Sequence, residues 1–228
     1  MIDEIYIKYP FYGVRRITDE LRYEHDLVVN HKKVHRLMRE MGIRGITPKK
    51  KTSISNDSHK KYPYLLKGYE IKSPNEVWMS DITYIRMEKG YMYLVAILDW
   101  YSRYVVSWEL SNTMEADFCV ESLQAALEVA KPKISNTDQG SQFTSERYIN
   151  VLEENEIKIS MDGRGRCYDN IWVERLWRSV KYEEVYLHEY RSGDEAREQL
   201  EKYFTFYNQK RRHQSLDRRP PVEVYFNC

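Results

Sequence analysis

The 228-residue sequence has few cysteines, and their spacing excludes a common kind of stabilised protein. Cys119, Cys167 and Cys228 are odd in number, lie far apart and form no CxxC pair. This pattern excludes a disulfide framework and argues against a cysteine-rich zinc site. No apolar run approaches the ~20 residues of a membrane-spanning helix, and residues 1–25 do not resemble a signal peptide. We therefore expect a cytoplasmic protein without a membrane segment.

The sequence also has little net charge, formally +1, but that average conceals an asymmetry. Residues 1–75 carry 16 Lys and Arg against 9 Asp and Glu, whereas residues 76–150 carry 6 against 11. A basic head followed by an acidic middle indicates a polyanion-binding region beside a carboxylate-rich site that attracts cations. The alternative is a solvated basic face without a partner.

Residues 1–46 are predicted to form a helix-turn-helix. Apolar residues recur with helical spacing over 11–25 and 31–41, with Asn30 as an expected N-cap and Gly42 as an expected stop. Basic side chains concentrate on the second helix, which favours DNA contact over a hairpin that only packs on its neighbour. The candidate DNA contacts are Arg15, Arg16, Lys32, Lys33 and Arg36. His31 and His35 have metal-ligand spacing, but no further ligand accompanies them.

The remaining chain divides into a basic linker, residues 47–72, and an α/β region, residues 73–228. The linker is lysine-rich and lacks periodicity, which is typical of a segment that lies along a phosphate backbone. After it, the predicted elements are strands at 77–87, 91–100 and 102–110, a helix at 114–130, a strand at 133–137, a helix at 144–155, a strand at 157–160, and helices at 170–188 and 194–208 before a basic tail. This order is that of a ribonuclease-H-like mixed sheet flanked by helices.

Three carboxylates occupy positions suited to catalysis. Asp81 lies within the first strand, Asp138 follows the 133–137 strand, and Glu174 lies on the 170–188 helix, with 35 residues between the last two. Converging carboxylates repel one another unless cations offset them. Two divalent ions such as Mg²⁺ or Mn²⁺ remove that conflict and support phosphoryl transfer. For any one acid alone, helix capping or simple solvation is the more ordinary role.

The helix that carries Glu174 has two expected faces. At about 100° per residue, Arg178 and Lys181 return to the side of Glu174, whereas Val173, Leu176 and Val180 form a separate apolar stripe. We expect the stripe to pack on the sheet and the two cations to contact DNA. The ordinary alternative for Lys181 is an exposed lysine or an ion pair with Glu174.

Several segments together resemble a known family. They are YGVRRITDEL, VNHKKVHRLMREMGI, WMSDITYI, NTDQGSQFTS, DNIWVERLWRSVKYEEVY and YNQKRRHQSL. They are similar to the second-frame (OrfB) transposases of two-frame bacterial insertion sequences, whose catalytic core is related to retroviral integrases. The resemblance covers nearly the whole chain and includes the interval of 35 residues.

The resemblance implies a DNA transposase in which Asp81, Asp138 and Glu174 bind two Mg²⁺ or Mn²⁺ ions and Lys181 contacts DNA ends. The implied reaction is nicking at the element's ends followed by 3′-hydroxyl strand transfer. The implied partners are double-stranded DNA, further copies of this chain on DNA, and a first-frame transposase portion. Further candidate DNA contacts are Arg178 and the tail residues Arg211, Arg212 and His213.

Two other functions remain open from the sequence. A ribonuclease-H-type or junction-resolving nuclease would use the same acids only for hydrolysis, although the basic N-terminal helices and tail argue against it. A truncated transposase remnant would act only as a DNA-binding protein, although the intact acids argue against decay.

Overall fold

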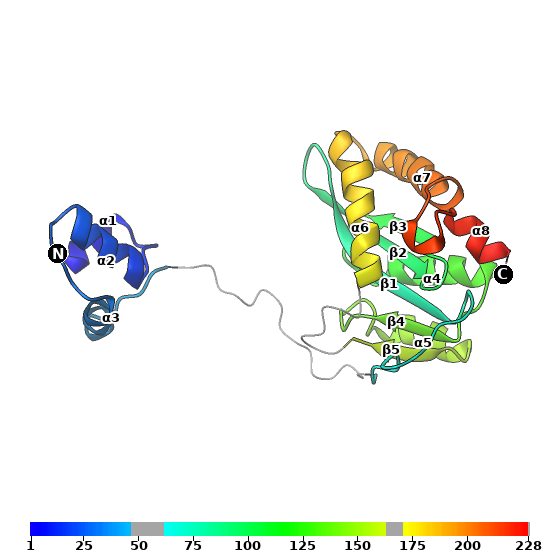
Figure 1. The fold of residues 1–228 in the computed structure, drawn as a ribbon, viewed down its shortest axis with the longest axis horizontal. Helices are drawn as coiled ribbons and strands as arrows, with labels where there is room; N and C mark the ends of the chain where they lie inside the picture. The colour runs from blue at the N-terminus through cyan, green and yellow to red at the C-terminus, as the bar shows by residue number, and fades with distance from the viewer. Residues whose placement is uncertain (47–61, 163–170, 228) are drawn as a thin grey trace. The chain divides into compact units, whose positions relative to one another are not determined.

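The computed structural model describes residues 1–46, 62–162 and 171–227, which fall into two compact units, Met1–Asp57 and Ser58–Cys228. Both units are drawn in Figure 1. Among the described residues, none of the helices combines the length and the apolar character required to cross a lipid bilayer. Each unit is described separately below.

The N-terminal unit is built around a small apolar core. Within residues 1–46 it contains α1 (Ile2–Lys8), α2 (Val14–Tyr23) and α3 (His31–Glu40). The side chain of Asn30 accepts a hydrogen bond from the Lys32 N–H, and Gly42, with φ of 67°, follows the last turn of α3. The expected cap and stop are therefore confirmed. The first helix, α1, is not predicted by the sequence; it contributes Ile5 to a core shared with Ile17, Leu21, Val34 and Met38.

The second unit contains a five-stranded mixed sheet with the order β3-β2-β1-β4-β5. Strands β1 (Val77–Arg86), β2 (Tyr91–Asp99) and β3 (Val105–Ser111) are antiparallel neighbours. Strands β4 (Ile134–Thr137) and β5 (Lys158–Met161) continue the sheet in parallel with β1. Each strand lies within three residues of its predicted bounds.

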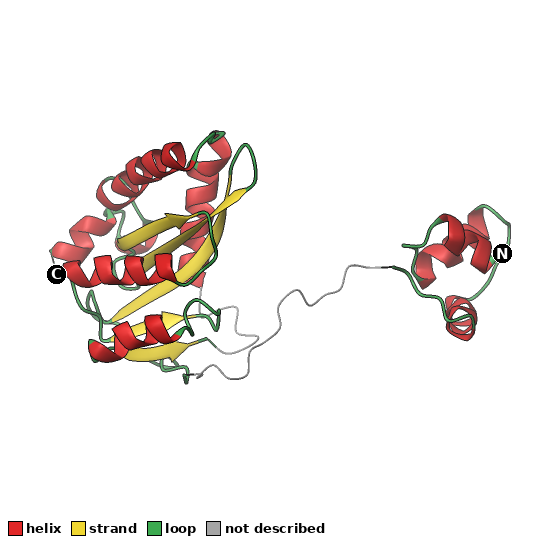
Figure 2. Ribbon diagram, turned by 180° about the vertical axis from the view of Figure 1, so that it is seen from behind, coloured by secondary structure: helices red, strands yellow, loops and turns green. Residues whose placement is uncertain are grey.

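Helices cover both faces of this sheet. On one face, helices α6 (Ile171–Glu183) and α7 (Gly193–Gln209) pack against Met79, Ile85 and Leu94 (Figure 1). On the other face, α4 (Asp117–Val129) and α5 (Glu146–Glu154) pack against Trp78, Val95 and Ile97 (Figure 2). Because side chains alternate along a strand, neighbouring residues of β1 enter different cores. The architecture confirms the expected ribonuclease-H-like mixed sheet flanked by helices.

Three segments differ from the sequence prediction. Helix α6 ends at Glu183 and a short 3₁₀ turn, η1 (Val185–Leu187), follows it. The tail after α7 contains η2 (Gln214–Leu216) and α8 (Pro221–Phe226), whose Tyr225 packs in the second core. Residues 62–72, assigned to the linker above, contact the sheet: the Leu65 N–H donates to Ser160 Oγ, and Leu66 is buried against Val77 and Ile134.

Candidate active site

Strand pairing places Asp81 and Asp138 at neighbouring positions. Strands β1 and β4 are parallel, and their register ends with Ser80 beside Thr137. The residue that follows each of these two is an aspartate: Asp81 lies within β1, and Asp138 comes directly after the end of β4. Neighbouring strands lie about 4.8 Å apart, which brings together two residues separated by more than fifty positions in the sequence.

Asp81 occupies an apolar and negatively charged environment. It belongs to the sheet face covered by α6, and its Oδ2 accepts a hydrogen bond of 2.9 Å from Nε1 of Trp177. The pKa of Asp81 is raised to about 6, mainly by burial and to a smaller extent by the negative charges of Asp138 and Glu174. Two hydrogen bonds, from Trp177 and from the Ile82 N–H, oppose this rise. The charges of both Asp138 and Glu174 therefore reach the carboxylate of Asp81.

Asp138 lies exposed in the loop after β4, where a glycine makes room for its carboxylate. The Gly140 N–H donates to Asp138 Oδ1 at 2.8 Å. A Cβ atom at position 140 would lie 2.9 Å from the same oxygen, closer than side chains normally allow. Glycine at this position therefore holds the carboxylate in place.

Helix α6 carries Glu174 in its first turn. Val173, Leu176 and Val180 are buried together with Trp177, so the predicted apolar stripe is confirmed. Glu174 is exposed and lies three residues before Trp177, the residue that contacts Asp81. Residues three apart share a helix face, so packing of Trp177 on β1 directs the first turn of α6 toward the aspartates.

The three acids offer oxygen ligands but do not form a closed metal cage. Among the described residues, no three His, Cys, Asp or Glu side chains are arranged as a metal-binding group. Within those same residues, no lysine or arginine forms an ion pair with Asp81, Asp138 or Glu174. Hard oxygen donors without a protein counter-charge fit a divalent cation. Without such an ion, electrostatic repulsion between the three carboxylates opposes their close approach.

The cationic candidates on α6 and in the tail have different surroundings. Arg178 is exposed, with its guanidinium 5.8 Å from the centre of the Tyr182 ring, and Lys181 is half-buried. Arg211, in contrast, is used inside the protein: its Nε and Nη2 donate to the two carboxylate oxygens of Glu183.

The two other tail candidates also have contacts within the protein. Arg212 is exposed, and its Nη1 donates to the Arg218 carbonyl oxygen at 2.9 Å. His213 is half-buried, and burial lowers its pKa to about 4, so its imidazole is neutral at pH 7. Of the three tail residues, Arg212 is the most accessible.

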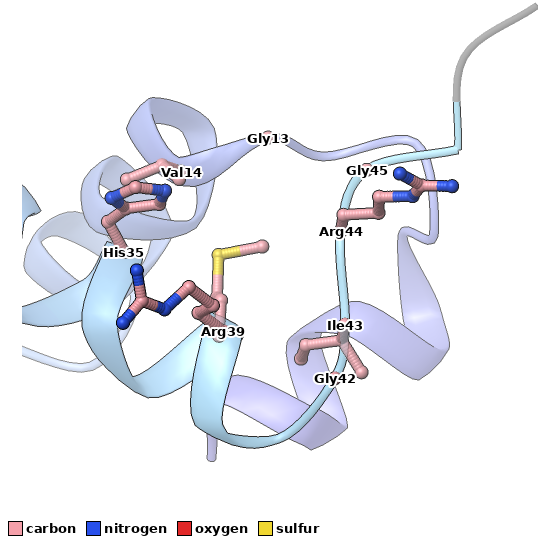
Figure 3. A pocket seen from close by; sticks show the side chains of 9 residues that line it. Gly13, Val14, His35, Arg39, Gly42, Ile43, Arg44 and Gly45 are labelled. Carbon is pink, nitrogen blue, oxygen red and sulfur yellow. The ribbon is translucent and has the colours of Figure 1, made fainter.

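The N-terminal candidates Arg15, Arg16, Lys32, Lys33 and Arg36 are all exposed on α2 or α3. Arg36 forms an ion pair with Glu40 one turn later. Beside them, a pocket of about 520 Å³ is lined by residues from the start of α2, from α3 and from the segment after it (Figure 3). His35 and Arg39 project from α3 at its edge. This pocket adds Arg39 and Arg44 to the cationic surface of the unit.

Two residues that shape the site are missed by sequence reasoning. Trp177 holds Asp81, and Gly140 accommodates Asp138. A tryptophan in an apolar stripe is normally a core residue, and a glycine after an aspartate normally marks a turn, so neither carried a distinguishing signal. The spacing itself was an available signal: Gly140 follows the strand-end acid Asp138 by two residues, where a larger residue would crowd the carboxylate.

Comparisons with known proteins identify the second unit as an integrase core domain. The integrase core domain family matches residues 72–167 and, through a second profile, residues 155–221; an HTH-like domain matches residues 1–51. A chain of the cryo-EM structure of the simian T-cell lymphotropic virus intasome in complex with PP2A regulatory subunit B56 gamma has the same fold. It aligns with 99% of this chain and 74% of its own, with a TM-score of 0.61 and 14% identity.

Curated relatives specify the family. The transposase for insertion sequence element IS904 of Lactococcus lactis is 33% identical over 93% of this chain and 86% of its own. Transposase InsF for insertion sequence IS3A of Escherichia coli is 34% identical over 89% and 72%. The IS600 uncharacterized 31 kDa protein of Shigella sonnei is 31% identical over 92% and 80%. This chain belongs to the IS3-family insertion-sequence transposases.

Proposed function

We propose that this protein nicks DNA at the ends of an insertion sequence and joins the released 3′-hydroxyl to another phosphodiester. In the first step a water oxygen attacks phosphorus and the 3′-oxygen leaves as a hydroxyl. In the second step that 3′-oxygen attacks a target phosphodiester, whose own 3′-oxygen leaves. The observation that carries the proposal is the β1–β4 pairing, which ends one residue before Asp81 and Asp138, together with the charges of Asp138 and Glu174 that help to raise the pKa of Asp81.

Asp81, Asp138 and Glu174 would hold two Mg²⁺ or Mn²⁺ ions. Such ions stabilise the charge on the attacking and leaving oxygens of an in-line displacement. The protein's own contribution is positional: Trp177 orients Asp81, and Gly140 leaves room for Asp138. Within the described residues, the acids form no competing ion pair.

Double-stranded DNA is the proposed partner of both units. The exposed cations of α2 and α3 would bind the element's ends, and Lys181, Arg178 and Arg212 would contact backbone phosphates near the acids. Joining two ends requires more than one copy of the chain on DNA. A first-frame transposase portion would be a further protein partner. The protein would be associated with the bacterial nucleoid.

The test uses the purified chain, Mg²⁺ or Mn²⁺, and labelled DNA that carries the mapped terminal repeats. We expect both nicked and joined products from the unmodified protein. Asp81→Asn, Asp138→Asn and Glu174→Gln should each abolish both products while leaving DNA binding largely intact.

Matched controls change acids away from the site. Asp117, which pairs with Arg147, and Glu198, which pairs with Lys202, are exposed, so Asp117→Asn and Glu198→Gln should retain activity. Near-normal cleavage by any of the three site variants would refute the site. Hydrolysis without joining would instead support a nuclease, and DNA binding with neither product would support a remnant.

A further inference from the structure

A second cavity lies beside the catalytic helix. Its volume is about 850 Å³, and α6, the turn between β2 and β3, and the segment after α7 line it. Its charged lining consists of Arg103, Arg175, Arg178, Arg211 and Glu183. Glu174 is not among its lining residues, so this cavity is separate from the three acids.

The cavity has an excess of positive charge. Glu183 is occupied by Arg211, which binds both of its carboxylate oxygens. His213 also lines the cavity, and it is neutral near pH 7 because burial lowers its pKa. Arg103, Arg175 and Arg178 have no ion-pair partner in the part of the chain that the structure describes. Arg103 still feels the negative charge of buried Asp99, but none of the three guanidinium groups makes a direct ion pair among the described residues.

Arg103 is the most unusual of the three. Its Nε and Nη1 are buried, and neither has a hydrogen-bond partner. Its guanidinium lies 3.5 Å from the centre of the Trp172 ring, which also contacts Arg175 at 4.7 Å. A cation–π contact offsets part of the desolvation cost, but it satisfies no N–H donor.

The chain holds Arg103 rigidly in this position. Asp99 is fully buried and accepts hydrogen bonds from the Ser102 N–H and hydroxyl, while the Arg103 N–H donates to the Asp99 carbonyl oxygen. Arg103 itself has a φ of 64°, a left-handed backbone conformation that residues other than glycine adopt at a cost in free energy. A turn with a left-handed residue thus sets Arg103 in the wall of the cavity, with two of its buried N–H donors unpaired.

We propose that this cavity binds a backbone phosphate of the DNA substrate through Arg103, assisted by Arg175 and Arg178. Guanidinium groups match phosphate oxygens with paired N–H donors, and a bound phosphate supplies acceptors for the unpaired donors and negative charge for the exposed arginines. The inference rests on the proposed function, because it takes the ligand to be the strand that reacts at Glu174.

The position of Arg178 connects the two regions. At about 100° per residue, Arg178 lies roughly 40° from Glu174 around the helix and Arg175 roughly 100°. Arg178 therefore faces both the acids and the cavity. A DNA strand that extends from a phosphodiester at Glu174 toward the cavity would pass Arg178.

The test measures binding of the full-length chain to labelled duplex DNA without divalent metal, by fluorescence anisotropy over a series of salt concentrations. Arg103→Met keeps the apolar length of the side chain and removes the donors. We expect its Kd to rise about tenfold to a hundredfold and the slope of log K against log salt to fall by about 0.9. The matched control is Arg197→Met, because Arg197 lies over Trp108 but is already paired with Glu109. That control should bind within about twofold of the unmodified protein.

Inorganic phosphate serves as a second probe. It should raise the unfolding midpoint of the unmodified protein relative to chloride at equal ionic strength, and this rise should disappear in Arg103→Met. Stabilisation by phosphate with unchanged DNA affinity would overturn the assignment to DNA. An unchanged Kd and an unchanged salt slope in Arg103→Met would overturn the proposal as a whole.

Two further measurements keep the outcome decisive. If Arg103→Met does not fold, Arg175→Gln replaces it, because Arg175 is exposed and lines the cavity, and we expect a loss of affinity in the same direction. Nicking by the unmodified protein, measured in parallel with Mn²⁺, separates the two hypotheses. If the unmodified protein nicks DNA and Arg103→Met binds DNA as tightly as the unmodified protein does, only the phosphate site is refuted. If Arg103→Met binds DNA more weakly but the unmodified protein does not nick, only the proposed enzyme activity is refuted.

Discussion

Replacing Asp81 by asparagine should stabilise the metal-free protein while destroying its activity. The pKa of Asp81 is about 6 in the folded protein against 3.8 for an ordinary aspartate. A difference of about two pKa units corresponds to about 3 kcal/mol against folding once the carboxyl is ionised in both states. Asparagine removes the charge, and its carbonyl oxygen can still accept the hydrogen bond from Trp177.

The direction of the pH dependence follows from the raised pKa. Because the folded protein binds this proton more tightly than the unfolded chain does, the cost is absent below pH 3.8 and grows as the pH rises through 6. Asp81→Asn should therefore equal the unmodified protein near pH 4 and exceed it by up to about 3 kcal/mol at pH 7.5.

Urea unfolding in EDTA, followed by tryptophan fluorescence, measures this difference. All five tryptophans belong to the unit Ser58–Cys228, so the signal reports the catalytic unit alone. Comparing the two proteins at each pH cancels every titration that they share. Adding Mg²⁺ should stabilise the unmodified protein but not the variant, since binding to the folded state raises its stability.

Two results would refute this account of Asp81. If the stability difference between the two proteins stays constant from pH 4 to 7.5, the pKa of Asp81 is not raised in the folded protein. Equal stabilisation of both proteins by Mg²⁺ would show that the ion binds elsewhere. Asp117→Asn, which changes an exposed acid on α4, should show neither effect.

Three further changes test the surroundings of the site. Trp177→Phe removes the hydrogen bond that orients Asp81, so we expect roughly a 10- to 100-fold loss of metal affinity or activity; unaltered Mg²⁺ dependence of nicking would contradict this. Gly140→Ala should displace the Asp138 carboxylate, with which its Cβ would clash, and lower activity with little change in the urea midpoint. An active, normally stable Gly140→Ala protein would exclude that role. Lys181→Ala should weaken binding to element ends and reduce the salt slope by about 0.9, as measured by anisotropy; an identical slope would rule out a phosphate contact.

Local patterns in the sequence were enough for most elements of the fold. The ends of α3 could be predicted from Asn30 and Gly42, because helix capping and a left-handed backbone conformation depend on neighbouring residues alone. The apolar stripe of α6 was equally readable from its spacing. Helices α1 and α8 escaped prediction because they have seven and six residues, too few for a periodic pattern to show.

The three acids could be named from the sequence, but only the sheet decides how they meet. Pairing of β1 with β4 sets Ser80 beside Thr137, the residues just before Asp81 and Asp138, and long-range register of this kind leaves no trace in either strand alone. Tertiary packing also paired Arg211 with Glu183 and left two N–H donors of Arg103 without an acceptor, although both residues look like ordinary basic residues in the sequence. A side chain's charge is local information, whereas its burial and its partners depend on segments that folding brings from elsewhere in the chain.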